Sequence, residues 1–189
     1  MSIFQNEIIN SLKILNNGGT ILYPTDTIWG IGCDATNVSA IKKIYTLKNR
    51  EEKKSMIILV SDAGMIAEYV SAPSQKILSF LSAQIKPTTA IFENAINLPT
   101  QLVNQNGSIA IRIVKDIFCQ QLIAQLRKPL VSTSANISGA AYPQNFKEIS
   151  DEIKNGVDYM VQHRREDLPA ASPSSIIKLD TKGEIEIIR

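Results

Sequence analysis

The sequence predicts an α/β fold in which helices pack on a central sheet. Two observations support this prediction: short apolar runs alternate along the chain with stretches of helical periodicity, and several of the runs are apolar at every position. Wholly apolar strands are typical of sheets that are covered on both faces. The 189 residues contain no repeat, low-complexity segment or linker, so we expect one domain spanning residues 1–189.

The predicted helices each follow from a local signal. The first pattern of helical spacing runs over residues 4–15, and the glycine pair at 18–19 supplies its C-terminal stop. Asn37 is placed to cap a second helix, and Asp62 opens a third. Further helical patterns fall at residues 74–84, 116–127 and 145–154.

The predicted strands are the apolar runs between these helices. They are residues 20–23, 56–60, 89–92, 108–114, 129–133, 159–161, 175–179 and 184–188. The stretch between the first strand and the second helix is assigned to a loop, because proline, threonine, aspartate and glycine replace the apolar residues there.

The composition is that of an ordinary globular protein. Lys and Arg number 20 against 18 Asp and Glu, so the net charge of +2 argues neither for nor against an anionic partner. Two distant cysteines, Cys33 and Cys119, with one histidine, His163, exclude the usual zinc ligand sets and predict reduced thiols. We expect His163 to be an exposed polar residue. No apolar run approaches the ~18 residues of a membrane span, which predicts a soluble, cytoplasmic protein without a membrane partner.

Polar residues and glycines follow the first strand in YPTDTIWGIGCDA, residues 23–35. Ligands of α/β sheets bind beyond the carboxyl ends of strands, and this stretch occupies such a place. Residues 25–27 offer two hydroxyls and a carboxylate, and glycines at 30 and 32 let the backbone approach a ligand closely. A capped turn followed by core packing of Trp29 explains the same residues equally well.

Two cations flank one residue in LKNREEKKS, residues 47–55. At alternate positions of an extended segment, Lys48 and Arg50 would face the same side, and a lysine beside an arginine fork suits phosphate or carboxylate binding. Cations at the end of a helix also complement the helix dipole. Taken alone, the residues favour this second interpretation, a surface cluster of charge.

Small hydroxyl and amide side chains gather in KPLVSTSANISGAAYP, residues 128–143. A predicted strand leads into them, so side-chain and backbone donors can surround an anion or a sugar. An Asx or Ser turn is the alternative, but this stretch has more such residues than a turn needs. We therefore favour a binding role.

An arginine lies inside an otherwise apolar strand, in SIAIRI. Arg112 shares its facing with Ser108, and burying it is costly unless an anion receives it. That anion is either a ligand or an internal Asp or Glu. A weaker signal is SPSSIIKLD, which places serines, Ser174 among them, at the entry to another strand.

Taken in order, these stretches resemble the YrdC/Sua5 family of threonylcarbamoyl-AMP synthases. PTDTIWGIGCDA, KNR, SIAIRI, VSTSANISG and SPSSIIKL carry the resemblance, from about Gly19 to the end of the chain. STSAN-x-SG and K-x-R are the specific blocks, whereas the first block is shared with relatives of unknown activity. The resemblance implies the short single-domain form, with a twisted open mixed sheet, helices packed on it and a basic concave groove.

The resemblance also implies a nucleotidyltransferase reaction. L-threonine, bicarbonate or CO₂, and ATP with Mg²⁺ give threonylcarbamoyl-adenylate and pyrophosphate, and partner proteins transfer the threonylcarbamoyl group to adenosine in tRNA. By similarity, threonine is bound by Thr25, Arg112 and Ser132. The residues implied on the ATP side are Lys48, Arg50, Ser108, Ser134, Asn136, Ser174 and Arg189, with Lys48 and Arg50 supplying the catalytic charge. No side chain is assigned to a metal.

The chain departs from the family pattern in three places. IKPTT at residues 85–89 replaces a P-G-P-x-T segment, so Lys86 either adds charge to the groove or points outward. Ser55-Met56 replaces a proline-leucine pair, and Asp26 replaces a commoner glutamate. None of these changes removes an implied ligand contact.

Two other functions fit the same fold. A non-catalytic RNA-binding or ribosome-associated module would use the basic groove on phosphates, and the groove also allows weak RNA binding by the enzyme. Aromatic residues at 6% and a net charge of only +2 weigh against such a module. A paralogue with another small-molecule activity would tend to lack the K-x-R and S-x-N blocks, and this chain has both.

Overall fold

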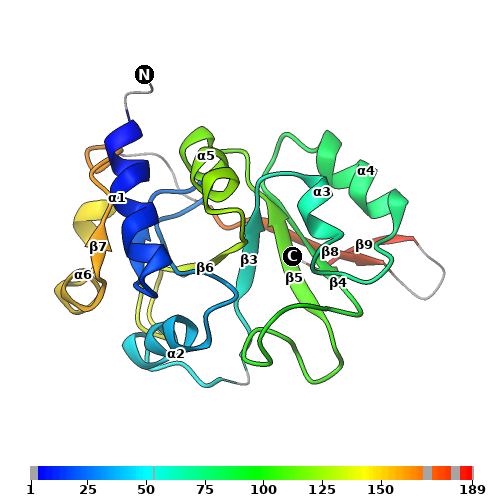
Figure 1. Cartoon of the computed structure of the whole chain (residues 1–189), viewed down its shortest axis with the longest axis horizontal. Coiled ribbons are helices and arrows are strands. Elements are labelled where there is room, and N and C mark those ends of the chain that lie inside the picture. The colour runs from blue at the N-terminus through cyan, green and yellow to red at the C-terminus, as the bar shows by residue number, and fades with distance from the viewer. Residues whose placement is uncertain (1–3, 53, 168–171, 180–183, 189) are drawn as a thin grey trace.

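Nine strands form one mixed sheet in the computed structural model, which describes residues 4–52, 54–167, 172–179 and 184–188 (Figure 1). The strand order is β7-β1-β2-β6-β3-β5-β4-β8-β9. The strands are β1 (Ile21–Tyr23), β2 (Gly30–Gly32), β3 (Ile57–Val60), β4 (Thr88–Phe92), β5 (Ile109–Ile113), β6 (Leu130–Ser134), β7 (Tyr159–Met160), β8 (Ser175–Leu179) and β9 (Ile185–Ile187). The pairs β1/β7, β3/β5 and β4/β8 are parallel and the others antiparallel, so the predicted mixed α/β sheet is confirmed.

The helices begin where the sequence signals predict. They are α1 (Gln5–Asn16), α2 (Val38–Leu47), α3 (Ala63–Ile66), α4 (Gln75–Ala83), α5 (Ile117–Leu126) and α6 (Asp151–Gly156), with a 3₁₀ turn η1 (Phe146–Glu148). Asn37 and Asp62 accept N-cap hydrogen bonds at the start of α2 and α3. The helix predicted over 145–154 is instead two pieces, because Asn145 caps η1 and Ser150 caps α6 separately.

One strand was not predicted. β2 lies inside the stretch assigned to a loop. It is placed between β1 and β6 and pairs antiparallel with both. Its glycines have low strand propensity but permit close packing. A Cβ atom at Gly32 would lie 2.5 Å from the carbonyl oxygen of Val131 and 2.8 Å from the Tyr23 ring. Glycine is therefore needed here for packing within the protein.

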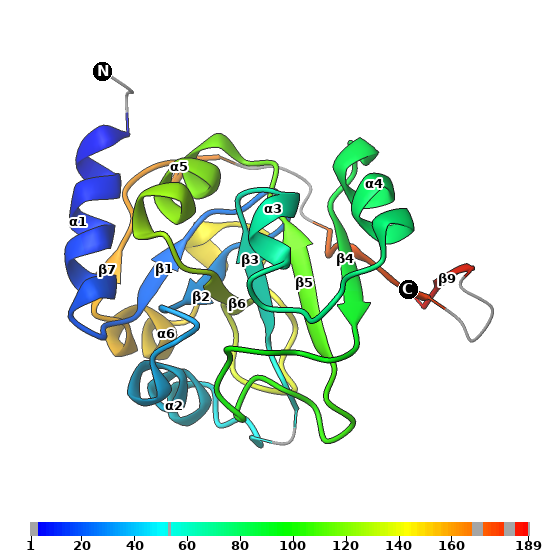
Figure 2. The same cartoon turned by 45° about the vertical axis from the view of Figure 1, so that its right-hand side comes forward.

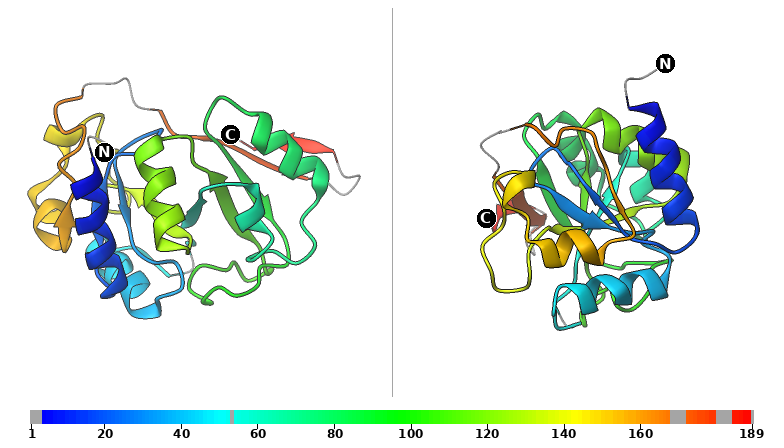
Figure 3. Two further views of the ribbon diagram at one scale, coloured as in Figure 1. Left: turned by 45° about the horizontal axis from the view of Figure 1, so that its top comes forward. Right: turned by 90° about the vertical axis from the view of Figure 1, so that its left-hand side faces the viewer.

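Two apolar cores lie on opposite faces of the sheet. Leu59 packs in a core with α1 and α5, whereas its neighbours Ile58 and Val60 pack in the core that includes α2, α4 and α6. Figure 2 shows α1 and α5 beside β1 and β7, and α3 and α4 beside β3, β5 and β4. In Figure 3, left, α6 and β7 lie at one end of the long axis and β9 at the other. No described helix is long and apolar enough to cross a bilayer.

Three residues noted in the sequence have core positions. Trp29 is buried and packs on Phe146 with 4.9 Å between ring centroids. This agrees with the interpretation of residues 23–35 as a capped turn followed by core packing of Trp29. Cys33 and Cys119 are buried free thiols, and burial raises the pKa of each. His163 is half-buried rather than exposed, because its ring packs on Phe4 at 4.9 Å.

The strand register puts several polar side chains on the face that carries α5. Leu59 pairs with Arg112 on one side and with Leu130 on the other, and Ser132 lies two residues beyond Leu130. All four side chains therefore face the same way. Leu59 and Leu130 are covered by the core with α1 and α5, whereas Arg112 and Ser132 lie beyond it and line a pocket.

Candidate active site

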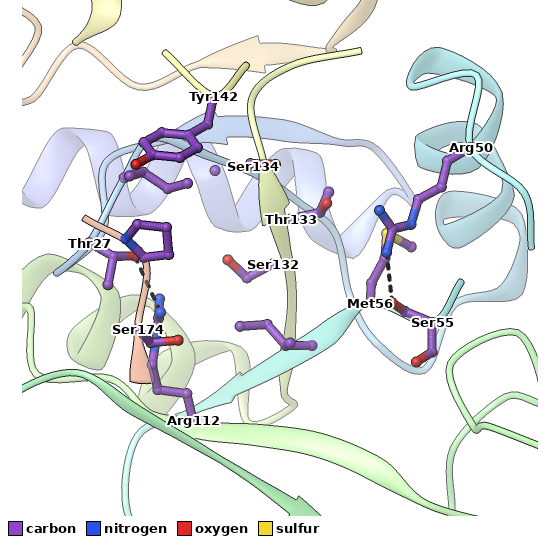
Figure 4. A pocket seen from close by; sticks show the side chains of 14 residues that line it. Thr27, Arg50, Ser55, Met56, Arg112, Ser132, Thr133, Ser134, Tyr142 and Ser174 are labelled. Carbon is purple, nitrogen blue, oxygen red and sulfur yellow. Dashed lines mark hydrogen bonds between the residues drawn. The ribbon is translucent and has the colours of Figure 1, made fainter. Parts of the chain in front are cut away.

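A pocket of about 300 Å³ opens over the polar part of this face (Figure 4). It brings together side chains from segments that are distant in the sequence. The lining residues are Thr27, Ile28, Gly30, Arg50, Ser55, Met56, Ile57, Arg112, Ser132, Thr133, Ser134, Tyr142, Pro173 and Ser174. This volume lies at the lower end of the range for small-molecule sites, roughly 300–1,000 Å³. Of the ten residues predicted for the site, it collects Arg50, Arg112, Ser132, Ser134 and Ser174.

Arg112 forms the floor of one side of the pocket and is nearly excluded from solvent. Its Nη2 lies 3.1 Å from Oδ1 of Asp26, and its Nη1 donates to the Thr27 hydroxyl at 3.2 Å. Asp26 is thus the internal acid that the sequence left open as an alternative to a ligand. The Arg112 Nε–H is buried and has no hydrogen-bond partner among the described residues, although the residue itself lines the pocket.

Thr25 shapes the loop that carries these partners. Its hydroxyl donates to the carbonyl of Ile28 at 2.8 Å and accepts from the amide of Thr27 at 3.0 Å. Thr25 is buried and does not line the pocket, whereas Thr27 does. The predicted polar triplet is therefore divided, because its first residue fixes the turn and its third faces the cavity.

Lys48 and Arg50 do not face the same side, which the binding interpretation of these residues required. The favoured interpretation, a surface cluster of charge, is wrong for Lys48, because this residue is buried. Helix α2 ends in a Schellman motif: the amide of Arg50 donates to the carbonyl of Tyr45, and that of Asn49 to the carbonyl of Thr46. Asn49 has φ of 47°, in the left-handed region. The chain therefore turns sharply at Asn49 and separates the two cationic side chains.

Lys48 lies beneath the loop that follows β6. Its ammonium donates to the carbonyl oxygens of Ser134 and Asn136, and its own carbonyl accepts from the amide of Ser138 at 2.8 Å. The residue is buried and is not part of the pocket lining. Burial, with a smaller effect of the neighbouring Arg50, lowers the pKa of Lys48 to about 7.

Arg50 faces the pocket on the side opposite Arg112 (Figure 4). Its Nε donates to the carbonyl of Lys54 at 2.8 Å and its Nη2 to that of Ser55 at 2.9 Å. These bonds hold the guanidinium in one position, while its Nη1 makes no hydrogen bond within the described part of the chain. The pocket thus has a fixed cation at each side with serine and threonine hydroxyls between them.

The end of β6 and the loop that follows it present some of the predicted groups to the pocket and use others in hydrogen bonds within the chain. Ser132, Thr133 and Ser134 line the pocket. The Asn136 amide instead donates to the carbonyls of Ile137 and Ala140, at 3.0 and 2.6 Å, and so shapes the loop.

The other predicted residues are dispersed. Ser174 shares a hydrogen bond of 2.8 Å with Thr89, which pairs with Arg112 across β4 and β5, so it lies on the Arg112 side. Ser108 lies outside the pocket, where its hydroxyl donates to Asn106 at 2.7 Å. It borders a separate depression of about 1,110 Å³ beside β4, β8 and β9. Arg189 lies outside the described residues.

Sequence reasoning did not single out several residues of the site. Tyr142 and Ser55 line the pocket, and Thr89 lies beneath it as the partner of Ser174. Tyr142 and Ser55 fell within stretches already marked as polar, but only the fold shows which members face inward. Lys86 is exposed and is not part of the lining, so it does not add charge to the pocket.

The pocket itself offers no cluster of metal ligands. Its lining contains no aspartate, glutamate, histidine or cysteine. Over the residues that the structure describes, no group of three such side chains is placed to hold a metal ion. The donor set suits anions, through guanidinium and hydroxyl groups, rather than a resident cation.

Several curated proteins that are similar to this chain share the name threonylcarbamoyl-AMP synthase. A threonylcarbamoyl-AMP synthase of Pseudoalteromonas translucida is 30% identical over 184 residues, which cover 96% of this chain and 97% of that protein. One of Blochmanniella pennsylvanica is 32% identical over 180 residues, which cover 92% of this chain and 90% of that protein.

Solved structures share the fold. P. abyssi Sua5 complexed with L-threonine matches with a TM-score of 0.86 and 19% identity over 96% of this chain, which spans 53% of that protein. E. coli YciO matches with a TM-score of 0.81 and 22% identity over 98% of this chain and 89% of that one. A family model for Sua5, YciO and YrdC proteins, described as "Telomere recombination", matches residues 13–189. This match includes nearly all of the sequence, and the chain belongs to the Sua5/YciO/YrdC family.

Proposed function

We propose that this protein is a threonylcarbamoyl-AMP synthase. It would join L-threonine, bicarbonate or CO₂ and ATP into threonylcarbamoyl-adenylate and release pyrophosphate, for threonylcarbamoyladenosine modification of tRNA. Family membership and the shared name of relatives that match over nearly their whole length support this proposal. We further propose that it acts in the cytoplasm and passes the adenylate to partner proteins.

The observation that carries the proposal is the pair of guanidinium groups on opposite sides of one small pocket. Both reactants carry anionic groups: threonine has a carboxylate and gains a second negative charge when its amine becomes a carbamate, and ATP has a triphosphate. Arg112 and Arg50 provide one fixed cation for each reactant, and the hydroxyls between them orient the groups that must react.

We assign the Arg112 side to the amino acid. The Arg112 guanidinium and the hydroxyls of Thr27, Ser132 and Ser174 line a space that suits a carboxylate with a small polar side chain. P. abyssi Sua5, which shares the fold, was solved with L-threonine. Thr25 would contribute through the loop rather than by contact, because its hydroxyl is already bonded within that loop.

We assign the Arg50 side, together with Ser134 and the loop that follows β6, to the phosphates of ATP. Arg50 would bind phosphate oxygens directly, and Lys48 would act by holding the loop that carries Ser134 and Asn136. Ser108 and Arg189 remain proposals for more distant parts of the nucleotide. Because the lining has no carboxylate, we expect Mg²⁺ to enter bound to the triphosphate, as part of the substrate.

The reaction requires the protein mainly to position the reactants and to stabilise negative charge. A carbamate oxygen attacks the α-phosphorus, the bond from that phosphorus to the oxygen bridging the β-phosphorus breaks, and pyrophosphate leaves with the electron pair. The carbamate is itself the nucleophile, so the reaction requires none from the protein. Fixed cations that face the developing charge lower the barrier, by about 3 kcal/mol for one preorganised donor.

A direct assay tests the proposal. Purified protein is incubated with labelled L-threonine, bicarbonate, Mg²⁺ and ATP, and pyrophosphate and the labelled adenylate are measured. We expect pyrophosphate release that requires threonine and bicarbonate together. Folded protein that releases none under these conditions would contradict the proposal and favour the non-catalytic RNA-binding alternative, which RNA-binding measurements would then examine.

A further inference from the structure

A short segment after β7 packs against the outer side of the loop that carries Asp26 and Thr27. We infer that Arg164, in this segment, is a positioning residue for the amino-acid side of the pocket. This inference rests on the proposed function, because it names the substrate whose binding depends on Arg164. The residue does not line the pocket and would act through the 24–28 loop.

The Arg164 guanidinium joins three separate parts of the chain. Its Nη1 donates to the carbonyl of Thr25 at 3.2 Å and lies 3.0 Å from a carboxylate oxygen of Asp116, and its Nε donates to Asp167 at 2.7 Å. The Arg164 backbone has φ of 64°, a conformation that residues other than glycine rarely adopt. Such a conformation persists where surrounding contacts determine it, and the guanidinium makes those contacts here.

The loop connects this guanidinium with that of Arg112. Arg164 holds the carbonyl of Thr25 from outside, and the next two residues, Asp26 and Thr27, hold Arg112 from inside. The backbone between the two arginines is therefore only three residues long. A loop that loses its outer contact has fewer constraints on the two groups that orient Arg112.

A second route runs through the start of α5. Asp116 accepts the N-cap hydrogen bond from the amide of Cys119 at 2.9 Å through one carboxylate oxygen and pairs with Arg164 through the other. The amide of the preceding residue, Lys115, donates to Asp26 at 2.9 Å. Both routes from Arg164 thus end at Asp26, the partner of Arg112.

The void that Arg164 borders beside the 24–28 loop is too small to hold a substrate. A void of about 10 Å³ is bordered by Arg164, Asp167, Gln144, Pro24, Thr25, Thr27, Ile28 and Trp29. A cavity needs roughly 10–15 Å³ to hold one water molecule. Arg164 is also not part of the lining of the larger pocket, so we expect it to act through its contacts with the protein.

The neighbouring arginine supplies a matched control. Arg165 donates to the carbonyls of Val161 and Met160, at 2.9 and 2.7 Å, and lies over the Phe146 ring at 4.5 Å. It belongs to the same segment but makes none of its hydrogen bonds to the 24–28 loop. Replacing it changes the charge of the segment equally and leaves the route to Arg112 in place.

The test compares Arg164→Met, Arg164→Lys and Arg165→Met with the unmodified protein. Steady-state kinetics should show that Arg164→Met raises the KM for threonine about tenfold, the effect of losing roughly 1.4 kcal/mol. Its KM for ATP should stay within about twofold, while Arg165→Met should match the unmodified protein in both. Equal changes in both KM values, no change in either, or the same shift in Arg165→Met would overturn the inference.

A second measurement does not depend on activity. Amide hydrogen exchange without substrates should be faster at residues 25–31 in Arg164→Met than in Arg165→Met. Unchanged exchange there would overturn the role of Arg164 even in an active enzyme, whereas faster exchange in a protein without threonine-dependent activity would reject only the proposed function. If Arg164→Met does not fold, Arg164→Lys, which keeps the charge but loses the fork, is judged by the same two readouts.

Discussion

Arg112 and Asp26 form an ion pair, with 3.1 Å between Nη2 and Oδ1, in which the side chains are only 3% and 8% exposed. Asp26 does not line the pocket, so it lies behind the guanidinium, and the Nε–H of Arg112 has no hydrogen-bond partner among the described residues. A buried charge of this kind is stable only with its counter-charge in place. The pair therefore both permits the burial of the arginine and fixes the orientation of its guanidinium beside the pocket.

Asp26→Asn removes the counter-charge while keeping the size of the side chain. Because Arg112 then has no buried anion, we expect the free energy of unfolding to fall by about 3 kcal/mol. The KM for threonine should rise as well, since the guanidinium loses its fixed orientation. Urea denaturation and steady-state kinetics measure the two effects.

Glu68→Gln is the control for Asp26→Asn, because it removes the same charge from an exposed position. It should change the free energy of unfolding by less than about 0.5 kcal/mol. An Asp26→Asn protein as stable as this control would show that the ion pair does not stabilise the fold.

Arg50→Ala removes the cation assigned to the phosphates. We expect kcat/KM for ATP to fall roughly a hundredfold, the effect of deleting one preorganised donor worth about 3 kcal/mol. The KM for threonine should change much less, because Arg112 lies on the other side of the pocket. Lys42→Ala, at an exposed position of α2, controls for the lost charge. Full turnover by Arg50→Ala would remove Arg50 from the site.

Lys48 should make stability depend on pH. Its pKa is about 7 in the folded protein against an ordinary value of 10.5, so between these values the unfolded chain binds more protons. The free energy of unfolding should therefore rise from pH 7 to pH 10, by at most about 1.4 kcal/mol per pH unit, and lose this contribution as the pH falls towards 7. A neutral amine still has two N–H groups for the carbonyls of Ser134 and Asn136.

Lys48→Met isolates this effect. The variant lacks the titrating group, so its free energy of unfolding should rise less between pH 7 and pH 10 when both proteins are unfolded with urea. Parallel pH profiles for the two proteins would mean that the Lys48 ammonium is not destabilised by its burial.

The fold was largely predictable because its elements carry local signals. The caps at Asn37 and Asp62 and the wholly apolar runs depend on neighbours in the sequence, and they appear where expected. β2 was missed because the need for its glycines comes from close packing against the neighbouring strands β1 and β6. That packing exists only in the assembled sheet and leaves no local signal in the sequence. Propensity cannot report such a requirement.

The site was predictable in its segments but less so in its side chains. The polar stretches do meet, yet Lys48 and Thr25 turn to backbone groups instead of the cavity. For Lys48 the reason is the left-handed Asn49, which a pattern of alternate cations does not reveal. The sequence predicted that an internal acid could pair with Arg112 but could not identify it as Asp26. The two residues lie on separate elements, and no periodic pattern in the sequence relates such positions.

The two glycines of β2 should differ in what their replacement costs. A Cβ at Gly32 would lie 2.5 Å from the Val131 carbonyl oxygen, whereas one at Gly30 would meet its nearest atom, the Ser132 hydroxyl, at 3.3 Å beside the pocket. Gly32→Ala should therefore destabilise the fold by about 1–3 kcal/mol, as overpacking does. Gly30→Ala should instead raise the KM for threonine with a smaller loss of stability, because its methyl group enters the pocket next to Ser132. Urea denaturation and kinetics of both variants test this contrast, and equal losses of stability would contradict the separate roles assigned to the two positions.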